Sequence, residues 1–182
     1  GKTVARIDYT VWSEVLNCSA CAGEIVFTEA ALDEETKAVT DVLTCPHCGA
    51  QGKKEQMDLR FETFVDPATG ATQRRPKRMP AMIVYKTGKT FYTKKPDETD
   101  LARIEKIAHL PIPKELPVDQ FPDCQMTRVG RMKTTNSTAV HFMFLPRAAQ
   151  AMALLWGKAR KYPDARTKSM LLFMVEQAFW TA

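Results

Sequence analysis

Four cysteines in two pairs are the residues of this sequence best suited to chemistry. Cys18 and Cys21 form one Cys-x-x-Cys pair, and Cys45 and Cys48 form a second pair after the intervening residues 22–44. Two such pairs can direct four thiolates at one tetrahedral Zn²⁺. Four protein thiolates fill the coordination sphere and leave no open position for a substrate. The spacing therefore predicts a zinc ribbon with a structural zinc and no catalytic role for the metal.

Two disulfides are the alternative chemistry for the paired cysteines. They would need an oxidising compartment, and a disulfide within a Cys-x-x-Cys pair closes too small a loop to stabilise much. The first residues contain no apolar signal-peptide core, so we expect a cytoplasmic, reducing location. The chain starts at Gly1 without an initiator Met, which predicts a piece of a longer protein. Cys124, the odd thiol, is expected to be structural, since no Cys-His arrangement surrounds it.

Charge is distributed unevenly along the chain, which carries a formal net charge of +5. Acids crowd the predicted ribbon, and residues 67–96 contain no acid. The basic residues within 67–96 are Arg74, Arg75, Lys77, Arg78, Lys86, Lys89, Lys94 and Lys95. A second basic region, 128–168, begins with Arg128, Arg131 and Lys133 and has Asp164 as its one acid. Clustered positive charge favours DNA as a partner, because neutralising phosphates releases counterions; a solvated basic face is the alternative.

The elements that must position these residues are predicted to be mostly strands in the first half of the chain. Residues 5–11 alternate polar and apolar side chains, as a half-buried strand does. Residues 24–28 and 39–44 are strand candidates joined by an acidic loop at 33–37, which would make the ribbon hairpin. Residues 57–65 predict a further strand, ended by a turn at 66–70, and residues 82–85 and 90–93 predict a hairpin.

Helices are predicted in the second half of the chain. Asp97 and Asp100 are placed as the capping residues of a helix that ends before Pro111. Four prolines within 111–122 predict an extended connector, and residues 125–137 are expected to be irregular. Two further helices begin near Pro146 and Pro163, and the second is apolar enough to need a partner. The sequence thus predicts an α+β fold with three consecutive segments, 1–56, 57–122 and 123–182.

Motifs for catalysis and for membrane insertion are missing from the sequence. It has no Gly-x-Ser-x-Gly elbow, no His-Glu-x-x-His, no Gly-x-Gly-x-x-Gly and no convincing carboxylate pair. No run of about eighteen apolar residues occurs, so we expect no membrane partner.

Several stretches resemble the central region of large prokaryotic site-specific DNA methyltransferases that modify exocyclic amino groups of bases. The most specific is Arg-Ile-Asp-Tyr-Thr-Val-Trp-Ser-Glu-Val at 6–15, which leads into the first cysteine pair. The others are 23–27, 29–31, the Cys-Pro-His-Cys-Gly at 45–49, 94–97 with the helix after it, 112–113, 140–142 and 146–147. The first cysteine pair departs from the family pattern, because Cys21 is followed by Ala22 where the family usually has Gly.

The resemblance implies a segment that lies between the two catalytic motifs of such an enzyme. Neither motif occurs here: the S-adenosylmethionine turn is missing, and Asp66-Pro67 is followed by Ala68 in place of a second Pro. The segment would then not methylate by itself, and S-adenosylmethionine would bind only the parent enzyme. Its partners would be DNA and the flanking methyltransferase domain of the same parent chain, in a setting such as restriction-modification.

Two functions from different classes follow from the sequence. In the first, the chain is a zinc-bearing segment that positions or recognises DNA for methylation by flanking catalytic parts. In the second, the chain is a protein-interaction or scaffold module that does not contact DNA, and the ribbon only fixes the orientation of its neighbours.

Overall fold

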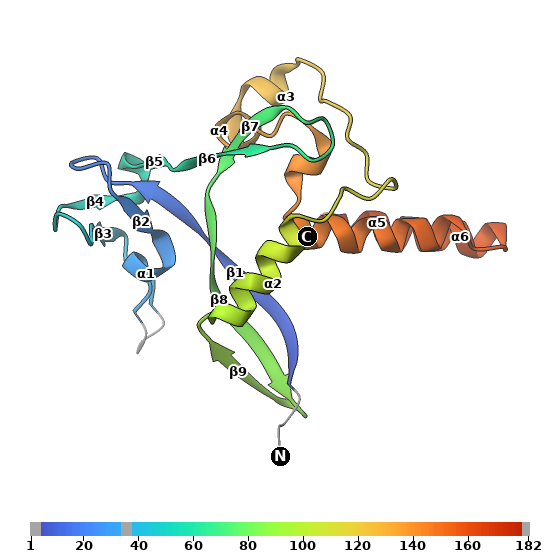
Figure 1. Cartoon of the computed structure of the whole chain (residues 1–182), viewed down its shortest axis with the longest axis horizontal. Helices are drawn as coiled ribbons and strands as arrows, with labels where there is room; N and C mark the ends of the chain where they lie inside the picture. The colour runs from blue at the N-terminus through green and yellow to red at the C-terminus, as the bar shows by residue number, and fades with distance from the viewer. Residues whose placement is uncertain (1–4, 34–37, 180–182) are drawn as a thin grey trace. The chain divides into compact units, whose positions relative to one another are not determined.

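The computed structural model describes residues 5–33 and 38–179 and has an α+β fold, which confirms the predicted fold class (Figure 1). Its named strands pair antiparallel, and its longest helices lie in the second half of the chain. In the part of the chain that is described, no helix is long and apolar enough to cross a membrane.

The chain divides into two compact units, and each of them is discontinuous in sequence. One unit comprises Gly1–Thr63 and Arg74–Leu101, and the other comprises Phe64–Gln73 and Ala102–Ala182. The discontinuity arises because strands far apart in the sequence pair within the first unit. The sequence predicts three consecutive segments and gives no sign of this pairing between distant strands. Their boundaries stay a prediction.

The sheet of the first unit is built on one long strand. Its strand order is β2-β1-β8-β9, and β5 also pairs with β1. The strands are β1 (Arg6–Asn17), β2 (Glu24–Val26), β5 (Asp58–Leu59), β8 (Arg78–Thr87) and β9 (Thr90–Lys94). Ile83 and Val84 are neighbours on β8 and point to opposite faces of the sheet, and both are buried, whereas Tyr9 of β1 and Phe91 of β9 stay exposed. Gly88, with φ of 61°, forms the turn of the β8–β9 hairpin and confirms the predicted hairpin.

The predicted pairing between residues 24–28 and 39–44 is wrong. β2 ends at Val26 and is followed by the short helix α1 (Phe27–Ala31), whose Thr28 N–H donates to the Ser13 hydroxyl at 3.0 Å. β2 pairs with β1, while β3 (Val42–Thr44) pairs with β4 (Gln51–Lys53). Each cysteine pair therefore closes a small hairpin of its own, which satisfies the flanking backbone groups locally. Residues 34–37 of the predicted acidic loop lie outside the described residues.

The predicted strand at 57–65 is interrupted. After the 3₁₀ helix η1 (Lys54–Gln56), β5 ends at Leu59, and Arg60 donates its N–H to the Val15 carbonyl at 2.8 Å. The chain then continues as β6 (Phe61–Val65), which pairs with β7 (Thr72–Pro76). The predicted turn between them is confirmed, with Gly70 at φ 71° and its N–H donating to the Asp66 carbonyl at 2.8 Å.

Helices follow the sheet. α2 (Glu98–Ala108) begins and ends close to its predicted bounds. Two short helices replace the expected irregular stretch at 125–137, because Thr127 and Thr135 supply local hydrogen bonds that close single helical turns. The remaining elements are α3 (Gln125–Arg128), α4 (Gly130–Thr134), the 3₁₀ helix η2 (Val140–Met143), α5 (Pro146–Arg160) and α6 (Ala165–Phe179).

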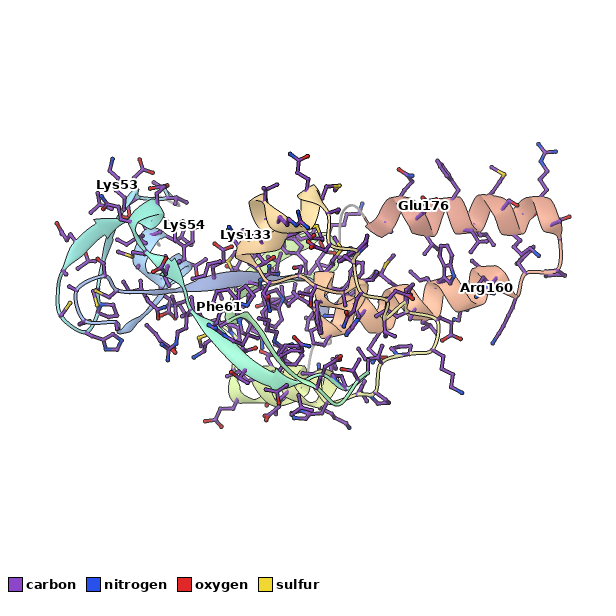
Figure 2. All side chains as sticks on the ribbon, turned by 90° about the horizontal axis from the view of Figure 1, so that it is seen from above. Lys53, Lys54, Phe61, Lys133, Arg160 and Glu176 are labelled. Atoms are coloured by element: carbon purple, nitrogen blue, oxygen red, sulfur yellow. The ribbon has the colours of Figure 1, made fainter. Side chains whose placement is uncertain are left out.

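The second unit has its own small core. Leu116 of the proline-rich connector is buried against Ala149 and Ala153 of α5, with Ile112 and Phe144 packed around them. α5 and α6 pack against each other and run side by side in Figure 2. The sequence predicts that α6 needs a partner, and α5 supplies one for part of it, while Met170, Phe173 and Met174 stay exposed.

Candidate metal centre and basic surface

The four paired cysteines converge on one point. Their Sγ atoms all lie within 4.8 Å of one another, with Cys18 and Cys48 at 3.8 Å and Cys21 and Cys45 at 3.7 Å. A zinc ion at about 2.3 Å from each of four tetrahedral sulfurs separates the sulfurs by about 3.8 Å. A disulfide would bring two sulfurs to about 2.05 Å. The spacing fits one tetrahedral metal ion and does not fit two disulfides.

The backbone of the first knuckle folds back on its leading cysteine. Cys18 donates its N–H to the Gly23 carbonyl at 2.9 Å, and Ala22 donates its N–H to the Cys18 carbonyl at 2.9 Å. The N–H of Ala20 also points at the Cys18 sulfur, 3.4 Å away. Hydrogen bonds of this kind orient a metal ligand and favour its thiolate form.

The second knuckle repeats the same geometry. Cys45 donates to the Ala50 carbonyl at 2.9 Å, Gly49 donates to the Cys45 carbonyl at 3.0 Å, and the His47 N–H lies 3.4 Å from the Cys45 sulfur. Gly49 has φ of 73°, and Ala22, at the equivalent position of the first knuckle, has φ of 57°. The left-handed backbone at both positions suits Gly better than Ala, because Gly has no Cβ.

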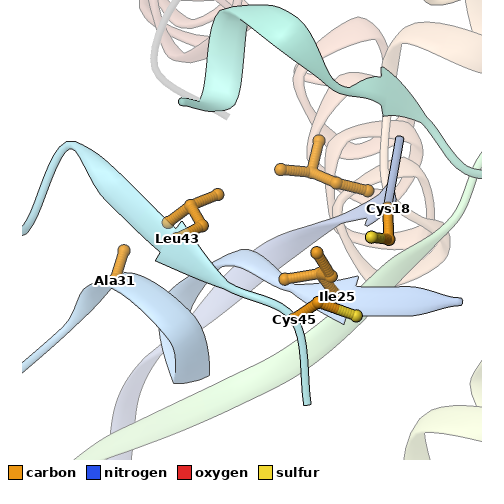
Figure 3. Packing of buried hydrophobic residues seen from close by; sticks show 6 residues of the cluster. Cys18, Ile25, Ala31, Leu43 and Cys45 are labelled. Atoms are coloured by element: carbon orange, nitrogen blue, oxygen red, sulfur yellow. The ribbon is translucent and has the colours of Figure 1, made fainter. Parts of the chain in front are cut away.

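Half of the cluster is buried and half is exposed. Cys18 and Cys45 pack with Leu16, Ile25 and Leu43 in the hydrophobic core of the ribbon, as Figure 3 shows. Cys21 and Cys48, in contrast, are exposed. Cys18 and Cys45 are therefore part of the hydrophobic core of the ribbon. A segment of this size buries too little apolar surface to fold by hydrophobic packing alone, so metal binding would contribute to its stability.

His47 does more than separate two cysteines. Its Nε2 lies 3.1 Å from the Glu24 carbonyl oxygen, so its ring bridges the two knuckles. A Cβ on Gly23 would meet the Cδ2 atom of His47 at 2.5 Å, so Gly23 is needed for this close approach. No local sequence pattern marks this contact, because His47 and Glu24 are 23 positions apart along the chain.

The thiols of the cluster differ in acidity. N–H groups of Cys21 and Ala20 lower the pKa of Cys18 to about 6. The Gly23 N–H lowers the pKa of Cys21, but the neighbouring thiols of Cys48, Cys45 and Cys18 outweigh it and raise that pKa to about 12. A bound cation favours the thiolate form of its ligands by its charge. This donor set suits a divalent metal such as zinc.

Acids pair with five of the eleven basic residues that we expected to bind DNA. The five pairs are Arg75–Glu62 at 2.6 Å, Lys77–Glu24 at 2.6 Å, Lys86–Asp8 at 3.8 Å, Lys94–Asp100 at 2.6 Å and Arg128–Asp123 with Nε to Oδ1 at 2.6 Å. The acid-free run of the sequence is therefore not free of acids in space. Pairing reduces the positive charge that these five residues can offer to phosphate.

The other six basic residues lie in different settings. The Arg74 guanidinium lies over the Phe61 ring at 5.0 Å, and Lys95 is exposed directly after β9. Among the described residues, the remaining four side chains form no ion pair: Arg78, Lys89, Arg131 and Lys133. Arg131 and Lys133 are exposed on α4, and Figure 2 labels Lys133 there. These four residues are the strongest candidates for phosphate contact.

A buried acid–base pair in the second unit was not anticipated from the sequence. His141 Nε2 lies 3.1 Å from Asp66 Oδ1, and both side chains are almost fully buried. Asp66 also accepts hydrogen bonds from the Ala68 N–H at 3.0 Å and the Thr69 hydroxyl at 2.6 Å. Burial raises the pKa of Asp66, but the hydrogen bonds from Thr69, Ala68 and His141 together hold it below its ordinary value.

The four cysteines are the one group of three or more potential metal ligands within residues 5–33 and 38–179. Among the residues that the structure describes, Asp66 and His141 belong to no such group, and they are part of the packing of the second unit. Comparisons with protein-family models, with curated proteins and with solved structures found no match.

Proposed function

We propose that this chain is the zinc-bearing, DNA-facing segment of a site-specific DNA methyltransferase. Catalytic parts that flank it in the parent chain would bind S-adenosylmethionine and transfer the methyl group. The methyltransferase part of the proposal is supported by the sequence motifs of the first half of the chain, above all Arg6 to Val15 and the Cys45 knuckle. The segment itself would be non-catalytic, since four thiolates leave the zinc no open position.

The observation that carries the DNA-facing role is the set of basic side chains without acid partners. Arg78, Lys89, Arg131 and Lys133 keep their full charge available in the described part of the chain. Phosphate contacts by Lys and Arg release counterions, which makes such binding strong at low salt and steeply dependent on salt. The zinc would hold the ribbon together and make no contact with DNA.

Fluorescence anisotropy with a labelled DNA duplex tests this role. We expect binding that weakens steeply between about 50 and 200 mM salt. Arg131→Gln and Lys133→Gln, made separately, should each reduce the slope of log K against log salt by about 0.9, the contribution of one phosphate contact. Lys53→Gln, an exposed lysine of the ribbon, is the matched control and should leave the slope unchanged. No binding at the lowest salt, or equal slopes for all three variants, would contradict the DNA-facing role.

A scaffold function is the second candidate, and the ion pairs favour it. Glu24, next to the first knuckle, binds Lys77 at 2.6 Å and Arg60 at 3.2 Å, which ties the ribbon to residues that are distant in sequence. A segment with this role would orient neighbouring domains without contacting DNA. The same titration separates the two functions, because a scaffold module shows no salt-dependent binding to the duplex.

A further inference from the structure

The strand register of the first unit places basic and aromatic side chains on one face of its sheet. Arg6 of β1 pairs with Lys86 of β8, and Lys86 pairs with Phe91 of β9, so these three residues form one row across three strands. Directly paired residues of antiparallel strands point to the same face. The next row on this face, two residues along β8, consists of Tyr9, Val84 and Thr93.

Two aromatic rings of this face are exposed. Tyr9 is 55% exposed and Phe91 is 59% exposed. Two strand spacings separate β1 from β9, and the two residues lie one row apart along the strands, so their backbones are about 12 Å apart. Each ring therefore offers a separate flat surface. Isolated exposed rings are ordinary, but two on one sheet face beside cations need a reason.

Positive charge accompanies the rings. Arg6 is exposed in the same row as Phe91, and the Lys86 ammonium lies 5.9 Å from the centre of the Phe91 ring. Lys89 lies at the adjacent turn. One acid, Asp8, approaches Lys86 at 3.8 Å and offsets part of this charge. Cations remain in excess around the rings, which complements a polyanion.

We propose that this face of β1, β8 and β9 binds single-stranded DNA, with bases stacked on Tyr9 and Phe91 and phosphates beside Arg6 and Lys86. Every unpaired base presents a flat π surface, and sequence-tolerant stacking on sheet aromatics is the usual way in which proteins hold single strands. Paired bases in a duplex are stacked on each other and cannot lie on a protein ring. The inference rests on the proposed DNA-facing role and names the form of DNA that this face takes.

The test compares a labelled single strand of mixed sequence with its duplex by anisotropy, using the whole chain. We expect Phe91→Leu and Tyr9→Leu each to weaken single-strand binding about tenfold, because the aliphatic side chain removes the π surface. Duplex binding should stay unchanged in both variants. Phe91→Tyr keeps the aromatic ring and should bind the single strand as tightly as the wild type. Phe173→Leu on α6, whose Phe is 61% exposed, is the matched control and should have no effect.

Different results would contradict the stacking face and the DNA-facing role. If both Leu variants bind the single strand as tightly as the wild type while duplex binding remains salt-dependent, the stacking face is wrong and the DNA-facing role stands. If neither form of DNA binds at low salt, both are wrong. If the Leu variants keep single-strand binding but lose concentration-dependent self-association, the face is a protein contact, which also overturns the inference.

Discussion

Ala22 and Gly49 occupy the same backbone position in the two cysteine knuckles. Both have positive φ, 57° for Ala22 and 73° for Gly49. The left-handed region costs an L-residue with a Cβ about 1–2 kcal/mol, and glycine reaches it without that cost. The first knuckle therefore contains a strained residue that the second knuckle avoids.

This difference predicts opposite effects of two substitutions. Ala22→Gly should stabilise the zinc-loaded chain by about 0.5–1 kcal/mol, the relief of strain minus the extra entropy of glycine in the unfolded chain. Gly49→Ala should destabilise it by about 1 kcal/mol; nothing lies within 4 Å of an added Cβ there, so the cost is purely conformational. Urea unfolding at constant zinc measures both. A lower midpoint for Ala22→Gly would show that the turn is not strained.

The buried pair of Asp66 and His141 makes stability depend on pH. The folded-state pKa of Asp66 is lowered, so its contribution is present above the ordinary carboxyl pKa of about 4 and is lost as the pH falls through the folded value. Asp66→Asn should destabilise the chain at pH 7 by about 2 kcal/mol, because it removes a charged partner from buried hydrogen bonds.

Unfolding midpoints from pH 7 to pH 3 measure this effect. The gap between wild type and Asp66→Asn should narrow as the medium becomes acidic. Asp123→Asn is the control: its carboxylate also has a lowered pKa, set by Arg128, but it lies exposed at the surface, where solvent screens the pair. A constant gap between wild type and Asp66→Asn over the whole range would contradict the assigned ionisation of Asp66.

Two elements that local sequence signals predict are confirmed, the cap of α2 and the β8–β9 hairpin. Asp97 and Asp100 cap α2 reciprocally: the Asp97 N–H donates to Asp100 Oδ2 at 3.1 Å, and the Asp100 N–H donates to Asp97 Oδ1 at 3.0 Å. The residues of this box are three positions apart, and so are the turn residues of the β8–β9 hairpin. Interactions of such short range can be read from a single sequence.

Removal of the cap should weaken α2 measurably. Asp100 is buried and also binds Lys94 at 2.6 Å, so Asp100→Ala should cost about 1 kcal/mol. Glu98→Ala, an exposed acid in the same first turn, is the matched control and should change stability much less. Denaturant unfolding followed by circular dichroism gives both values. Equal midpoints for the two variants would mean that the cap contributes nothing.

Pairing between distant elements could not be predicted in the same way. The sequence favours pairing of residues 24–28 with 39–44, because both stretches have the composition of strands. In the structure β2 pairs with β1, and β3 pairs with β4. Phe27–Ala31 forms a helix because Glu and Ala favour helix and the Ser13 hydroxyl accepts the Thr28 N–H near its start. Partner choice of this kind depends on tertiary packing, which overrides local preference.

In the whole molecule, the cysteine spacing predicted the candidate metal centre. The distribution of charge along the sequence did not predict the surface charge, because folding brings acids next to several of the clustered bases. Lys77 binds Glu24, 53 positions away in the chain, and His141 meets Asp66 across 75 positions. No local pattern marks such contacts. Ion pairing therefore leaves less positive charge on the surface than the sequence indicates, and Arg78, Lys89, Arg131 and Lys133 form no ion pair within the described part of the chain.

The zinc content of the purified chain tests whether the four thiolates hold one structural zinc. We predict one equivalent of zinc per chain in the wild type and in Cys124→Ser, whose thiol lies outside the cluster. Cys45→Ser should lose the metal and unfold at a markedly lower temperature, because metal binding and folding of the ribbon are coupled. Zinc well below one equivalent in the wild type, or an unmoved thermal midpoint in Cys45→Ser, would contradict the claim.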